Sequence, residues 1–153
     1  METIQRCHEC GAEVQEGQTC QENFYQMLGW ESEQPANWEV HHLTVLCYHL
    51  QHPSLYSPEG LSAGFTLLTD FLERGTTPTE VRKQRGAQVD SGARTWKIKG
   101  TPESHGVYDP PVVWSMTTNQ VIAAGIDNYC DSVRAWASSI LISLKTSGHI
   151  PPQ

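Results

Sequence analysis

The sequence has no long apolar run and no signal region. Its longest uncharged apolar stretch lies near Ala135 to Leu144, which is too short and too interrupted by serine to span a bilayer. The chain begins Met-Glu-Thr-Ile-Gln-Arg, without the apolar segment of a secretory signal. These absences argue against secretion and against a membrane partner, so we expect a cytoplasmic protein.

Positive charge is scarce, above all near the N-terminus. The net charge is −7, and residues 1–40 contain no lysine and a single arginine, Arg6. Because affinity for nucleic acid phosphates comes from Lys and Arg, general nucleic-acid binding is not expected. The basic residues gather in residues 80–99, which we interpret as a solvated loop facing the acidic end of the same chain.

Known catalytic signatures are missing too. The sequence has no phosphate-binding glycine loop, no His-Glu-x-x-His motif, no paired catalytic carboxylates and no internal repeat. It does have bulky packing residues, with five Trp, five Tyr and three Phe in 153 residues, which is enough for a folded core. We therefore expect one folded domain over residues 1–153.

The spacing of apolar residues predicts a mainly α fold. Helices are expected over residues 21–33, 38–51, 57–75 and 117–147, where apolar positions recur every three or four residues. Residues 76–115 are predicted to form loops, with one short helix at 79–85 and one short strand at 96–99. The expected architecture is a bundle of about four helices, with irregular insertions and an N-terminal cysteine-rich zinc knuckle in residues 1–20.

The N-terminal cysteines are the strongest chemical signal. Cys7 and Cys10 are two residues apart, Gly11 follows them, and Cys20 comes ten residues after Cys10. A Cys-x-x-Cys-Gly turn aims both sulfur atoms at one point, and thiolates suit the tetrahedral coordination that zinc prefers. The second Cys-x-x-Cys pair of the usual signature is missing, so the fourth ligand must come from elsewhere in the chain.

Candidates for the fourth ligand lie along the helix predicted over residues 38–51. They are Cys47, His41, His49 and His52. His52 ranks first because Pro53 ends the helix there and a loop can approach it, and His41 ranks second. These two histidines lie roughly 16 Å apart along a helix, so they cannot bind the same ion. Tyr48 lies one turn before His52, as an acid–base partner or as a support for the ligand. The alternative, which we favour for each of these residues taken alone, is a buried polar side chain satisfied by hydrogen bonds.

Other interpretations of the cysteines stay open. A redox Cys-x-x-Cys normally opens a helix after a strand, and no such context precedes Cys7. A structural disulfide is disfavoured in the cytoplasm, and an iron–sulfur cluster is a further possibility. We interpret Cys130, which falls inside the last predicted helix, as a core residue and not as a ligand.

Several of these residues together resemble one known family. The chain resembles the uncharacterised bacterial family called domain of unknown function 5946. The resemblance rests on Cys7-His-Glu-Cys10-Gly, on Cys20 and on the run Val40-His-His-Leu-Thr-Val-Leu-Cys-Tyr-His-Leu-Gln-His-Pro53. Trp136-Ala-Ser in the last helix fits it as well. The resemblance implies a bacterial protein whose motif positions are Cys7, Cys10, Cys20, His41, Tyr48, Gln51, His52 and Pro53. Its relatives also carry a histidine in the third helix, where this chain has Ser62-Ala-Gly-Phe65. The family has no established activity.

Two functional hypotheses follow from these residues. The first is a zinc-binding protein that acts as a metal-stabilised binding or regulatory module, with an unknown protein or small molecule as its partner. The alternative is a small metal-dependent enzyme of the hydrolase or thiol-transferase type, which uses the helix face of His41, Tyr48 and His52. A binding module needs a closed four-ligand site and an exposed apolar patch, whereas an enzyme needs an open position or an acid–base pair in a cleft. The sequence alone does not decide whether the protein is an enzyme.

Overall fold

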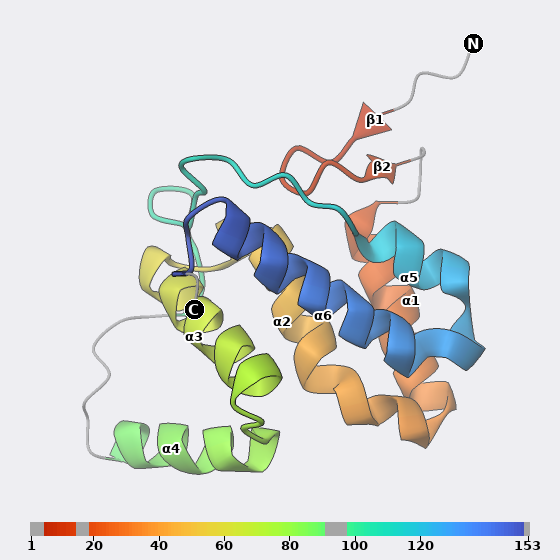
Figure 1. Ribbon diagram of the computed structural model, residues 1–153, viewed down its shortest axis with the longest axis horizontal. Helices are drawn as coiled ribbons and strands as arrows, with labels where there is room; N and C mark the ends of the chain where they lie inside the picture. The colour runs from red at the N-terminus through yellow and green to blue at the C-terminus, as the bar shows by residue number, and fades with distance from the viewer. Residues whose placement is uncertain (1–4, 15–18, 91–97, 152–153) are drawn as a thin grey trace. The chain divides into compact units, whose positions relative to one another are not determined.

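The computed structural model describes residues 5–14, 19–90 and 98–151. Over these residues the protein is mainly helical, which confirms the predicted fold class (Figure 1). The chain forms two units, Met1–His52 with Tyr108–Gln153 and Pro53–Val107. The single-domain organisation stays a prediction. Each helix in the described part of the chain is too short or too polar to cross a lipid bilayer.

The first unit opens with a small hairpin. Strand β1 (Gln5–Arg6) pairs antiparallel with β2 (Glu13–Val14), and Gln5 lies opposite Val14. The turn between the strands requires Gly11, whose φ of 76° lies in the left-handed region that other residues rarely adopt. The sequence predicts only loops here, because strands of two residues are too short to show an alternating pattern.

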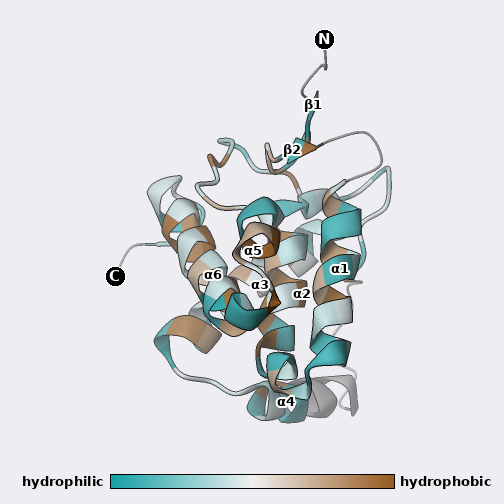
Figure 2. Cartoon of the chain, turned by 90° about the vertical axis from the view of Figure 1, so that its right-hand side faces the viewer, coloured by the Kyte–Doolittle hydropathy of each residue, from teal (hydrophilic) through white to brown (hydrophobic). Residues whose placement is uncertain are grey.

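Helices make up the rest of the first unit. They are α1 (Cys20–Glu33), the 3-10 helix η1 (Pro35–Val40), α2 (His41–Gln51), α5 (Thr118–Ala124), the 3-10 helix η3 (Ile126–Asn128) and α6 (Tyr129–Thr146). Within this unit α1 packs against α2 and α5, and α6 packs against α2 and α5. In Figure 2 the ribbon of α1 is mostly teal and white, whereas α2 carries more brown, in keeping with a helix buried on most sides.

The core of the first unit holds large apolar side chains together with one satisfied polar group. Its fully buried residues include Met27, Leu50, Val133, Trp136, Ile140 and Leu144. Each such side chain contributes about 1.5–3 kcal/mol through burial. The Nε1 atom of Trp136 donates to Oε1 of Gln51 at 3.2 Å, and Nε2 of Gln51 donates to the Met116 carbonyl at 2.7 Å. These bonds fix the end of α2, directly before His52.

The C-terminal helical region is interrupted, in contrast to the continuous helix predicted over residues 117–147. Its start is as predicted, because Thr117 and Gln120 form a capping box. Gly125 then ends α5 with a φ of 86°, and the helical direction resumes through η3 into α6. A positive φ is readily adopted by glycine, which has no Cβ, so Gly125 permits the break between the two helices.

The second unit, Pro53–Val107, contains the 3-10 helix η2 (Pro53–Leu55), α3 (Pro58–Glu73) and α4 (Pro78–Asp90). The side chain of Ser57 caps α3 by accepting from the Gly60 amide at 2.9 Å. Helix α4 is longer than the segment predicted over 79–85. Trp96 and Lys97 of the predicted strand lie outside the described residues, and Lys99 forms an isolated antiparallel bridge with Tyr56.

Candidate metal centre

The turn between β1 and β2 is closed by its own backbone. The Cys7 amide donates to the Ala12 carbonyl at 2.8 Å, and the Gly11 amide donates to the Cys7 carbonyl at 2.9 Å. Cys10 is buried and Cys7 is half-buried. The hairpin therefore holds the two sulfur atoms in a tight turn, as the Cys-x-x-Cys-Gly motif predicts.

Cys20 and His52 come from the ends of two helices. Cys20 is the first residue of α1, and Thr19 caps that helix by accepting from the Glu22 amide at 3.3 Å. His52 follows the last residue of α2 and precedes Pro53, so its side chain leaves the helix where the chain changes direction.

A backbone hydrogen bond sets the orientation of the His52 ring. Its Nδ1 lies 2.6 Å from the Tyr48 carbonyl oxygen, which can only accept, so Nδ1 carries a proton and Nε2 is the nitrogen that would bind a metal once the ring is neutral. Nε2 is buried and has no hydrogen-bond partner among the residues that the structure describes. An unpaired buried polar atom costs about 1–3 kcal/mol, and coordination of a metal ion would remove that cost.

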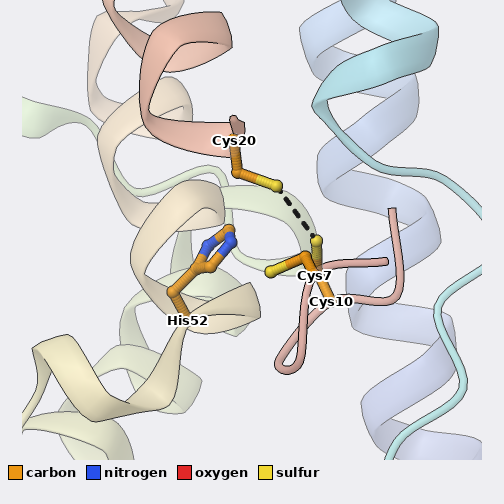
Figure 3. A group of neighbouring side chains, drawn as sticks. All are labelled: Cys7, Cys10, Cys20 and His52. Atoms are coloured by element: carbon orange, nitrogen blue, oxygen red, sulfur yellow. Dashed lines mark hydrogen bonds between the residues drawn. The ribbon is translucent and has the colours of Figure 1, made fainter. Parts of the chain in front are cut away.

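The four side chains converge on one point (Figure 3). Their potential ligand atoms, from Cys7, Cys10, Cys20 and His52, all lie within 4.8 Å of one another. The sulfur atoms of Cys10 and Cys20 are 3.5 Å apart, far longer than a disulfide bond of about 2.05 Å. Tetrahedral coordination with metal–sulfur bonds of about 2.3 Å places sulfur atoms ~3.8 Å apart. The spacing of the four residues therefore suits a single tetrahedral ion.

The charge state of the cluster also favours a cation. Hydrogen bonding from Cys10 and Cys20 holds the pKa of Cys7 far below its usual range, and hydrogen bonding to Cys20 and Cys7 raises the pKa of Cys10. Burial disfavours a charged His52 ring, but the nearby sulfur atoms of Cys20 and Cys7 outweigh it and raise the pKa of His52 to about 10. The thiols thus share negative charge that a cation would neutralise.

Apolar groups surround the cluster. Val14, Tyr48 and Trp114 pack against the buried Cys10, Ala12 and Cys20. The Tyr48 ring lies 4.5 Å from the His52 ring and 4.2 Å from the Phe24 ring, measured between centroids, which places Tyr48 beside His52 as the sequence predicts. Burial raises the pKa of Tyr48 to about 12, so its hydroxyl stays protonated at neutral pH. Tyr48 therefore lines the site with a neutral side chain.

The other candidate ligands lie elsewhere. His41 is outside the cluster, and its Nδ1 lies 2.6 Å from Oε1 of Glu31. Cys47 is fully buried, where burial raises the pKa of its thiol, and the Nδ1 atom of His49 lies 2.8 Å from the Val45 carbonyl oxygen. Cys130 is half-buried, with its sulfur 3.6 Å from the Ala36 carbonyl oxygen, so it is not the core residue that we predicted.

Glu31 is not among the site residues predicted from the sequence, although its position in α1 carries a signal. Cys20, Phe24, Met27 and Glu31 recur at helical spacing on one face of α1, and all four are buried. A glutamate in an apolar stripe needs a partner, because a buried carboxylate is costly without one. The partners, His41 and Tyr129, lie on other helices and have no sequence relation to Glu31.

The fold and the cysteine cluster together define a helical protein with a candidate Cys3His metal centre. The chain belongs to the family of unknown function DUF5946, whose model matches residues 5–145. This match confirms the family resemblance and covers all four residues of the cluster. No curated protein and no solved structure matches the chain.

Proposed function

We propose that this protein binds one zinc ion through Cys7, Cys10, Cys20 and His52, and that it acts as a metal-stabilised binding or regulatory module. The observation that carries the proposal is the convergence of three thiols and one buried imidazole nitrogen within 4.8 Å. Four protein ligands complete a tetrahedral shell, which is typical of structural zinc sites.

The donor set favours zinc over an iron–sulfur cluster. Such clusters are normally held by four cysteines, or by two cysteines and two histidines on a cluster of two irons. Three thiolates and one imidazole match a structural Cys3His zinc site, and zinc is borderline-soft enough for both kinds of ligand. When zinc is bound, it supplies a fixed point that joins the hairpin turn to the ends of α1 and α2.

A closed site argues against catalysis at this metal. Three thiolates donate much negative charge to the ion and weaken its Lewis acidity. Zinc deaminases also use cysteine ligands, but they pair the metal with a glutamate two residues after the first ligand. Glu9 has that spacing from Cys7, yet it lies in a turn, and the second Cys-x-x-Cys pair is missing.

A polar cavity beside the hairpin supports the binding role. It has a volume of about 350 Å³, and its lining includes Arg6, Cys10, Glu13, Trp114, Asn119 and Gln120. This volume is within the usual range for small-molecule sites, and its charged and amide groups suit a small polar ligand. Because Cys10 and Gly11 form part of the wall, a metal that fixes the turn would also fix the shape of the cavity.

The proposal predicts about one zinc per chain in protein purified under reducing conditions, measured by elemental analysis. Cys10→Ser should abolish zinc retention and lower the melting temperature by more than about 10 °C, since metal-binding free energy contributes directly to folding. Cys130→Ser is the matched control and should keep both properties. Metal-free protein with a native fold, or equal effects of the two substitutions, would contradict the proposal.

A further inference from the structure

A buried carboxylate lies in the first unit, apart from the cysteine cluster. Glu31 is 1% exposed. Its Oε1 is 2.6 Å from Nδ1 of His41, and its Oε2 accepts from the Tyr129 hydroxyl at 2.5 Å. The Tyr129 oxygen is also 2.9 Å from Oγ1 of Thr44. Both carboxylate oxygens are therefore occupied by specific partners from α2 and α6.

If its role were only structural, this buried carboxylate would be an unfavourable choice for the stability of the fold. Burial of a carboxylate costs several kcal/mol, and an apolar residue at the same place is often neutral or more stable. Phe24 and Met27 show that the same face of α1 accepts apolar side chains. Burial raises the pKa of Tyr129, so its hydroxyl remains a donor and Glu31 remains the acceptor. A functional role for the Glu31–His41 pair would account for a buried carboxylate at this place.

His41 is the member of this group that reaches the surface. Its side chain is 32% exposed, whereas the Glu31 side chain is fully buried. The Trp38 ring stacks on it, with centroids 4.0 Å apart and an interplanar angle of 7°. Because Nδ1 faces Glu31 and one ring face is covered by Trp38, Nε2 is the nitrogen left for a ligand. Trp38 itself is 56% exposed and offers a flat apolar surface beside it.

We propose that Glu31 and His41 form a proton-transfer dyad in which Nε2 of His41 takes a proton from water or a hydroxyl group that attacks a small acyl compound. The flat surface of Trp38 suits an aromatic or otherwise apolar portion of that substrate. His41 would be the catalytic residue, and Glu31 would be the positioning residue that fixes the Nδ1–H tautomer and stabilises the imidazolium.

The proton balance of this step is complete without a further reactant. The O–H bond of the attacking group breaks and the proton bonds to Nε2, while the oxygen forms a bond to the acyl carbon. The bond from the acyl carbon to its leaving oxygen then breaks, and Nε2 returns the proton to that oxygen. The ring is neutral again at the end, and nothing is oxidised or reduced.

Other charged and titratable groups lie near the dyad. His42 follows His41 in α2, and burial and the neighbouring His41 and Arg134 lower the pKa of its ring. Arg134 of α6 pairs with Glu39 of η1 at 3.1 Å and faces Asp131 at 3.9 Å. Because these neighbouring groups also influence the pH dependence of the rate, the test substitutes only Glu31 or His41 and leaves the neighbours unchanged.

The test is hydrolysis of p-nitrophenyl acetate by the full zinc-loaded chain. His41→Gln should lower the rate at least tenfold, and Glu31→Gln should lower it and shift the pH profile to lower pH, because the neutral amide stabilises the imidazolium less. His49→Gln is the control, since its ring is held by the Val45 carbonyl and not by a carboxylate. An unchanged rate in His41→Gln, or an unchanged pH profile in Glu31→Gln, would overturn the dyad.

A measurement on the unsubstituted protein guards against a Glu31→Gln chain that fails to fold. Nitrogen NMR of the imidazole groups should show His41 with its proton on Nδ1 and with Nε2 unprotonated in the neutral ring. A neutral ring that carries its proton on Nε2 would equally overturn the proposal, because that nitrogen could not accept a proton.

Discussion

His52 is the residue on which the proposed metal centre depends most. Its Nδ1 is held 2.6 Å from the Tyr48 carbonyl oxygen, and its Nε2 is buried in the cysteine cluster. Metal-binding histidines commonly have this arrangement, in which one ring nitrogen donates to a carbonyl and the other binds the metal. The backbone of α2 thus prepares the ring for coordination before any ion arrives.

Substitution of two neighbouring histidines separates the ligand from a bystander. His52→Ala should weaken zinc binding by roughly 100-fold or more, because loss of even an indirect support of a metal ligand costs ~10–100-fold. His49→Ala should leave the affinity unchanged, although its ring also lies against a backbone carbonyl, at 2.8 Å. Competition with a chromophoric zinc chelator measures both affinities. Similar losses in the two variants would show that His52 is not a ligand.

Individual residues also show how far the sequence predicted the site. His52 could be ranked first because Pro53 ends the helix, and the structure brings it to the cysteines. The position of His41 outside the cluster could not be predicted from sequence, because its partner Glu31 lies on another helix. The alternative that His41, Tyr48 and His52 act together does not fit the contacts, since His41 joins Glu31 and Tyr48 lies beside His52.

Among the elements, the hairpin turn places the strictest demand on the backbone. Gly11 has a φ of 76°, and among the described residues no neighbouring atom would lie within 4 Å of a Cβ at this position. Gly11→Ala should therefore cost only the left-handed backbone strain, about 1–2 kcal/mol in the free energy of unfolding, and should keep the zinc stoichiometry. Urea denaturation of the zinc-loaded protein measures this cost.

Gly29 provides a control, because alanine at this position should raise the free energy of unfolding, whereas alanine at Gly11 should lower it. It lies inside α1, and a Cβ there would likewise have no neighbouring atom of the described residues within 4 Å. Gly29→Ala should therefore stabilise the protein by about 0.5–1 kcal/mol through helix propensity. If both alanines stabilised, or if Gly11→Ala removed the metal, the turn would not have the geometry described.

Helices were predicted most accurately where capping side chains mark their first residues. Ser57 with Pro58 marks the start of α3, and Thr117 with Gln120 marks the start of α5. Gly125 was visible in the sequence, but the apolar stripe on both sides of it favoured a continuous helix. Helix α4 was underestimated because its residues are mostly polar, and such a segment lacks the apolar periodicity that predicts a helix.

For the whole molecule, the metal would secure a part of the first unit that cannot stabilise itself. A hairpin with two paired residues on each strand is not stable alone in water. The Arg6–Glu13 ion pair adds little, because both side chains are exposed. The thiolates of the turn, joined through an ion to Cys20 and His52, would add a strong attachment to the packing of Val14, Tyr48 and Trp114.

Stability should fall as the pH falls below about 6.5, the ordinary value of histidine. Burial lowers the pKa of His49 and of His42, so the unfolded chain binds protons more readily than the folded chain in this range. The free energy of unfolding therefore has its full contribution from the neutral rings of His49 and His42 above pH 6.5. This contribution is lost as the pH falls from 6.5 towards the lowered pKa that each ring has in the folded protein. His49→Gln should lose less unfolding free energy between pH 7.5 and pH 5.5 than the unsubstituted protein. Equal losses in urea titrations would show that His49 makes no such contribution.

X-ray absorption at the zinc edge of the reduced, purified protein tests the metal centre most directly. We expect four-coordinate zinc with three sulfur ligands near 2.3 Å and one nitrogen ligand near 2.0 Å. This shell would correspond to Cys7, Cys10, Cys20 and His52. A shell with fewer than three sulfurs, or with water in the fourth position, would contradict a closed structural zinc site.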